Sequence, residues 1–201
     1  LDLHRKSTTF LSNLNEEIAA DIAEKAKELV VCGHEIERSC IRFIAMEQPL
    51  ATDLMYIESS IRVISHVKRI AYLCRNIAES AATIEGIKVS NKIMGDLEYM
   101  ADYVQIMLTR GFGSFCNQDI SVARELASDD DKVDDLFDII LSHTTELLTE
   151  KTQNALEIVN IIFIARYLER IADRVVNIGE RVIFINTHKR PHIEELKKEE
   201  Q

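Results

Sequence analysis

A thirteen-residue segment occurs twice in this chain, and the duplication limits the folds that the chain can adopt. Residues 67–79 read VKRIAYLCRNIAE and residues 168–180 read LERIADRVVNIGE, with six identical positions at an offset of 101. Apolar residues recur in both copies at the three- or four-residue spacing of one helix face. Two copies of one helical pattern predict a fold made of two similar halves.

Few residues in this chain interrupt a helix. Only two prolines and six glycines occur among 201 residues, which indicates long helices joined by short turns. The pattern predicts a turn at Pro49, where a helix cannot continue, a break at the two glycines of residues 110–115, and a weaker turn within residues 149–154. We expect helices at about residues 13–47, 51–83, 88–110, 117–149 and 152–186.

These helices predict an all-α fold of two pseudo-repeated three-helix bundles. The second half supplies three helices, whereas the first half supplies two and a short N-terminal piece. The first helix of the first repeat is therefore expected to be short or missing. We assign residues 1–85 to the first repeat, 86–187 to the second, and 188–201 to a charged tail.

The charge of the chain limits its partners. A formal net charge of −10 argues against direct nucleic-acid binding, which needs a basic face, and favours cations or basic protein surfaces. The four cysteines show no metal-binding spacing. We see no signal peptide and no apolar run long enough for a transmembrane segment, so we expect a cytoplasmic protein.

Four acids are candidates for a metal site in the second half. Two antiparallel helices that meet near residues 151 and 152 rise by equal amounts per residue, so positions equally far from the turn are level. This places Asp134 level with Glu169, and Asp130 level with Asp173. Four converging carboxylates favour a hard divalent or trivalent metal ion. The alternative is a solvated acidic face, in which neighbouring arginines offset the repulsion.

The corresponding positions of the first half lack acids. The same counting from Pro49 leads to Ala26, Val30, Lys68 and Tyr72. A lysine repels a metal ion and the apolar residues offer no ligand. We therefore expect no second metal site.

Three segments together resemble the PhoU family of bacteria and archaea. They are CIRFIAMEQPLATDL at residues 40–54, DDKVD at residues 130–134 and ARYLERIADRVVNIGE at residues 165–180. The resemblance implies two pseudo-symmetric three-helix bundles and frequent homodimers. It also implies a non-enzymatic regulator that represses phosphate uptake and the phosphate-starvation response.

The resemblance further implies partners and a cofactor. The partners would be the phosphate ABC transporter and a sensor kinase or transcription regulator. The cofactor would be iron, zinc, magnesium or manganese, held by the acidic motif that Glu169 and Asp173 match and by its partner acids Asp130 and Asp134. This chain departs from the family pattern at Lys68 and Tyr72, and at Met55, where the family has an arginine.

Two other functions fit the same helical pattern. The chain could be a helical regulatory domain of another ion transporter, such as a sodium–phosphate or potassium system. A ferritin-like di-iron oxidase is the enzyme alternative, but such bundles use Glu-x-x-His motifs and none occurs in this sequence.

Overall fold

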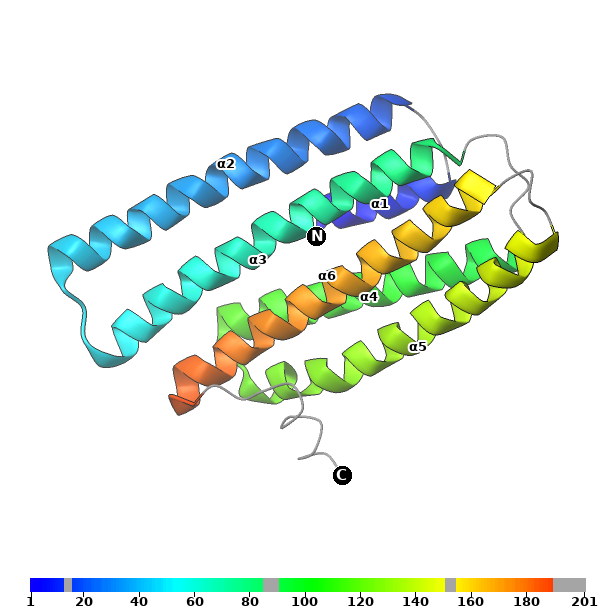
Figure 1. The fold of residues 1–201 in the computed structure, drawn as a ribbon. Coiled ribbons are helices and arrows are strands. Elements are labelled where there is room, and N and C mark those ends of the chain that lie inside the picture. Colours follow the sequence, from blue (N-terminus) through cyan, green and yellow to red (C-terminus); the bar gives the residue numbers. More distant parts are fainter. Residues whose placement is uncertain (13–15, 85–90, 151–154, 190–201) are drawn as a thin grey trace.

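The chain is helical throughout the part that the structure describes. The computed structural model describes residues 1–12, 16–84, 91–150 and 155–189, and no strand occurs in these ranges. The helices are α1 (Asp2–Ser12), α2 (Glu16–Glu47), α3 (Ala51–Ala82), α4 (Asn91–Asn117), α5 (Ile120–Glu150) and α6 (Ala155–Thr187) (Figure 1). The predicted all-α fold class is confirmed.

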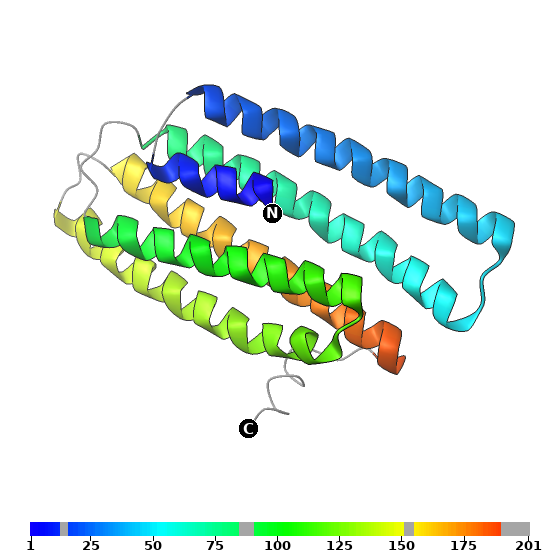
Figure 2. The same cartoon turned by 180° about the vertical axis from the view of Figure 1, so that it is seen from behind.

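The two central helices, α3 and α6, run antiparallel and pack against each other (Figure 1). Helix α2 packs against α3 on one side of this pair, and α5 packs against α6 on the other. Helices α1 and α4 cover the back of this four-helix layer (Figure 2). Each half thus consists of three helices, with the long α3–α6 contact between them.

The first helix is short, as the sequence predicts. Helix α1 has 11 residues, whereas its counterpart α4 has 27. Helix α1 begins beside the middle of α3 (Figure 2). An open groove of about 560 Å³ lies on α2, and its lining includes Ile36, Cys40 and Phe43. Ile36 is 40% exposed, whereas Ile140, which lies 104 positions later on α5, is completely buried.

Equivalent ion pairs join the outer helices of the two halves. Lys6 of α1 lies 2.9 Å from Asp21 of α2. Arg110 of α4 pairs with Glu125 of α5, and each partner lies 104 positions after its counterpart in the first pair. The duplication therefore extends beyond the thirteen-residue motif to contacts between helices.

The predicted break at residues 110–115 is wrong, because α4 continues through this segment to Asn117. A Cβ atom at Gly111 would collide with the side chain of Val175 on α6, so this glycine allows two helices to approach closely. The chain turns at Gln118, whose φ is 55°. Asp119 then caps α5, since its carboxylate accepts hydrogen bonds from the backbone N–H groups of Ser121 (3.0 Å) and Val122 (3.2 Å).

Of the other predicted turns, the structure describes one in full. The turn at Pro49 is confirmed, since α2 ends at Glu47 and α3 begins at Ala51. The link around residues 85–90, the centre of the turn at 151–154 and residues 190–201 of the tail lie outside the described ranges.

One hydrophobic core extends through both halves. It includes Leu73 and Ile77 of α3, Val104 and Met107 of α4, and Leu168 of α6, each at most 2% exposed. The core therefore lies behind the α3–α6 pair and holds the faces of these helices in fixed orientations. None of the helices in the described ranges contains an apolar stretch that is long enough to cross a membrane.

Candidate functional site

The four predicted acids lie on the adjoining helices α5 and α6, whose line of contact we call the α5–α6 groove. A close contact defines the register of this groove: a Cβ atom at Gly179 of α6 would lie 2.9 Å from the carbonyl oxygen of Ala123 on α5. Asp130 follows Ala123 by seven positions, and Asp173 precedes Gly179 by six. In antiparallel helices these acids are level to within one residue. The register predicted from the sequence agrees with this contact.

The four acids differ in their exposure to solvent. Asp130 and Glu169 are buried, at 6% and 9% exposure, whereas Asp134 is exposed and Asp173 is half-buried. The acids of each helix are one turn apart, on the same face of that helix. Each level of the groove therefore pairs a buried acid with a more exposed one: Asp130 with Asp173, and Glu169 with Asp134.

The fold raises the pKa of Glu169. Burial raises the pKa of Glu169 to about 7, and the negative charges of Asp173 and Asp134 add to this rise. Arg166 opposes it, because its Nη1 donates a hydrogen bond of 2.6 Å to Oε1 of Glu169. The other oxygen, Oε2, is buried and has no hydrogen-bond partner among the described residues. Glu169 therefore exchanges a proton near neutral pH.

The donor atoms of this groove suit a hard metal ion in their chemistry. Carboxylate oxygens are the ligands that such ions prefer, and the unpartnered Oε2 of Glu169 is an available donor. Within the described ranges, however, no three His, Cys, Asp or Glu side chains are already gathered around one metal position. A metal ion would therefore require these side chains to reorient.

The first half has an ion pair where the second half has its acids. Lys68 occupies the position equivalent to Glu169, and its Nζ lies 2.7 Å from both carboxylate oxygens of Glu37 on α2. Its methylene groups fill the space beside Gly33, where a Cβ atom would lie 2.9 Å from Cγ of Lys68. Counting from Pro49 placed Val30 beside Lys68, three residues from this contact. The lysine brings its own positive charge to the groove.

Sequence reasoning missed two functional contacts of the acids. Glu37 was not identified as the partner of Lys68. The carboxylate of Glu37 also lies 3.3 Å from Nδ1 of His34, which precedes it by one turn on α2. Asp129 was not identified as a candidate, and it is buried at 6% exposure. It accepts hydrogen bonds from Arg110 and from the hydroxyl of Tyr103 (2.7 Å). Asp129 therefore holds α4 against α5, and no local sequence signal separates it from its acidic neighbours.

The fold and this groove define a duplicated three-helix-bundle protein with an acidic groove in one repeat. The PhoU domain model matches residues 1–81 and 97–182, which span both repeats. The chain belongs to the PhoU family.

Curated relatives agree with this assignment. The chain is 41% identical over 191 residues to "phosphate-specific transport system accessory protein PhoU homolog 1" of Methanothermobacter thermautotrophicus, covering 95% of this chain and 87% of the relative. It is 30% identical over 165 residues to a PhoU homolog of Aquifex aeolicus, covering 82% and 74%.

Solved structures share the fold. The crystal structure of PhoU from Pseudomonas aeruginosa aligns with a TM-score of 0.88 at 24% identity, over 94% of this chain and 90% of that one. PhoU from Streptococcus pneumoniae aligns with the same TM-score at 21% identity, over 95% and 89%. Together with the relatives, these findings favour the PhoU prediction over the oxidase and the other-transporter alternatives.

Proposed function

We propose that this chain is a non-enzymatic regulator of phosphate uptake and phosphate-starvation signalling. The observation that carries the proposal is the match of the PhoU domain across both repeats, together with relatives whose names place them in the phosphate-specific transport system. Its partners are the phosphate ABC transporter and a sensor kinase or transcription regulator. We further propose that it acts in the cytoplasm as a homodimer.

The regulatory function is tested by complementation. A host strain that lacks its own PhoU protein would express this chain, and phosphate uptake would be measured at high external phosphate. We expect the chain to lower the uptake rate and to co-purify with the ABC transporter. A folded, abundant chain that leaves uptake at the rate of the deletion strain contradicts the proposal.

We also propose that the α5–α6 groove binds a divalent or trivalent metal ion through Asp130, Asp134, Glu169 and Asp173. The buried, unpartnered Oε2 of Glu169 and the negative field of Asp173 and Asp134 support this proposal. The metal would neutralise the carboxylates and hold α5 against α6. Iron, zinc, magnesium and manganese all accept such oxygen donors.

Elemental analysis of the purified protein tests the metal site. We expect about one metal centre per chain, since a single groove supplies the oxygen ligands, and its loss in Asp173→Asn. Asp102→Asn on the exposed face of α4 is the matched control and should keep the metal. The metal-site proposal is overturned if wild-type protein contains no metal after growth with iron, zinc, magnesium or manganese. It is also overturned if Asp173→Asn and Asp102→Asn contain equal amounts of metal. Neither result affects the regulatory proposal.

A further inference from the structure

A carboxylate on α3 ties two arginines together at the contact between the halves. Glu58 of α3 accepts a hydrogen bond of 2.8 Å from Nε of Arg62, one turn later on the same helix. Its second oxygen accepts a hydrogen bond of 3.4 Å from Nη1 of Arg181 on α6. This shared carboxylate holds the two guanidinium groups near each other across the α3–α6 groove.

The same contact determines which residues meet further along the groove. His66 follows Glu58 by eight positions on α3, and Arg174 precedes Arg181 by seven on α6. Because α3 and α6 are antiparallel (Figure 1), His66 and Arg174 are level to within one residue. The electrostatics agree with this register: burial lowers the pKa of His66 to about 4, helped by the charges of Arg174, Arg181 and Arg62.

Positively charged side chains gather here in an acidic protein. The charges of Arg62, Arg174 and Arg181 all act on His66, on a chain whose formal net charge is −10. Nε of Arg174 is buried and has no hydrogen-bond partner among the described residues. Buried donors normally have a hydrogen-bond partner. A ligand could supply the partner that Nε of Arg174 lacks.

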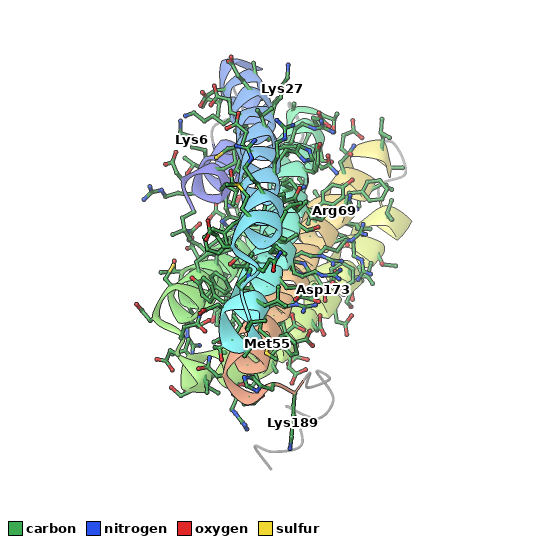
Figure 3. The ribbon with its side chains drawn as sticks, turned by 90° about the vertical axis from the view of Figure 1, so that its left-hand side faces the viewer. Lys6, Lys27, Met55, Arg69, Asp173 and Lys189 are labelled. Atoms are coloured by element: carbon green, nitrogen blue, oxygen red, sulfur yellow. The ribbon has the colours of Figure 1, made fainter. Side chains whose placement is uncertain are left out.

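Two sequence neighbours of these residues mark one side of the molecule. Arg69, on the turn of α3 after His66, and Asp173, which precedes Arg174, lie on the same side of the bundle, opposite to Lys6 of α1 (Figure 3). Arg62 and Arg69 are exposed and Arg174 is half-buried. A small ligand can therefore meet the exposed side chains from solvent, and contact with Nε of Arg174 requires that side chain to move.

We propose that Arg62, His66, Arg174 and Arg181, which we name the α3–α6 cationic cluster, bind inorganic phosphate. Guanidinium groups match the oxygens of a tetrahedral oxyanion through paired N–H donors. Binding rests on the charges and donors of this cluster, and its relevance to regulation rests on the proposed function. The ligand would join the two halves of the protein at their contact.

His66 provides selectivity between tetrahedral anions. Its neutral ring has one nitrogen that accepts a hydrogen bond. Hydrogen phosphate carries a hydroxyl group that can donate to this nitrogen, whereas sulfate carries none at neutral pH. The cluster therefore binds phosphate more tightly than sulfate.

Calorimetric titration of the purified chain with inorganic phosphate at pH 7 and constant ionic strength tests the proposal. EDTA is included so that phosphate cannot bind through a metal ion in the α5–α6 groove. We expect saturable binding that weakens about tenfold or more in Arg174→Gln, since a hydrogen bond to a charged group is lost. Arg42→Gln removes an exposed charge from α2 and should bind as the wild type does.

Two further variants make the outcome decisive. Arg62→Gln repeats the test at an exposed position if Arg174→Gln does not fold, as judged by its helical circular dichroism. His66→Leu should bring the affinities for phosphate and sulfate close together. Equal weakening in Arg42→Gln and Arg174→Gln, or no binding by wild type, overturns the proposal. Intact binding in a chain that does not lower phosphate uptake instead overturns only the regulatory function.

Discussion

The ammonium group of Lys68 lies 2.7 Å from the carboxylate of Glu37, at the position where the second repeat places Glu169. The two repeats thus use one position of the same helical motif in opposite ways. In the first, a lysine pairs with an acid on the neighbouring helix. In the second, an acid is left with one buried oxygen that lacks a hydrogen-bond partner among the described residues.

The Lys68–Glu37 pair should contribute to stability in a pH-dependent way. Both side chains are largely buried, at 15% and 20% exposure, so we expect a coupling of about 1 kcal/mol in a double-mutant cycle of Lys68→Met and Glu37→Gln. Lys68 lowers the pKa of Glu37. The coupling is therefore present above the ordinary pKa of a glutamate and is lost as the pH falls through the lowered value.

Urea unfolding of the wild type, the two single variants and the double variant, at pH 7 and at pH 3, measures this coupling. Methionine keeps the apolar stem that packs beside Gly33, so the cycle reports the charge rather than the packing. A coupling that is absent at pH 7, or that grows toward pH 3, contradicts the prediction.

Glu169→Gln should gain stability relative to the wild type as the pH rises. Burial raises the pKa of Glu169 to about 7, so the folded state prefers the protonated acid. Its stabilising contribution is complete below the ordinary pKa and is lost as the pH rises through 7. In metal-free protein, we expect the difference in unfolding free energy to shift by on the order of 2–3 kcal/mol in favour of the glutamine between pH 4 and pH 8.

Thermal or urea unfolding in EDTA at several pH values supplies these free energies. Asp102→Asn is the matched control, since its carboxylate is exposed on α4, and its difference from wild type should change little with pH. A flat profile for Glu169→Gln would show that burial does not perturb this acid.

Gly179→Ala should destabilise the protein because the α5–α6 contact leaves no room for a methyl group. The new Cβ would lie 2.9 Å from the carbonyl oxygen of Ala123 and 3.0 Å from Cδ1 of Leu126. A backbone carbonyl within a helix cannot move aside, so we expect a loss of about 2 kcal/mol. Gly95→Ala in α4 meets no atom within 4 Å and should instead stabilise by about 0.5–1 kcal/mol. Equal effects in the two variants would place α5 and α6 in a different register.

Ile140→Ala and Ile36→Ala should differ although the two positions are equivalent in the repeats. Ile140 is completely buried, so its truncation should cost about 2–5 kcal/mol. Ile36 is 40% exposed in the open groove on α2, so its truncation should cost less than about 1 kcal/mol. Urea unfolding of the 201-residue chain measures both, and similar losses would mean that the groove on α2 is covered.

Much of the helical architecture follows from local patterns. The duplicated motif, the scarcity of proline and the turn at Pro49 predict the helices and their order, because helix formation depends on residues within a few positions of each other. The break at residues 110–115 was predicted wrongly for the same reason. Local propensity treats Gly111 as an interruption, whereas the fold uses it to bring α4 close to α6.

The sequence by itself determined the PhoU-type duplication and the positions of the acids along the axes of α5 and α6. Every residue raises a helix by the same amount, so counting from a turn is sufficient. Only the tertiary structure decided which acids are buried, that Lys68 pairs with Glu37, and that the charge of Arg174 acts on His66 across the two halves. Those relations depend on how each helix is rotated about its axis and on which distant helix packs beside it, and the whole core determines both.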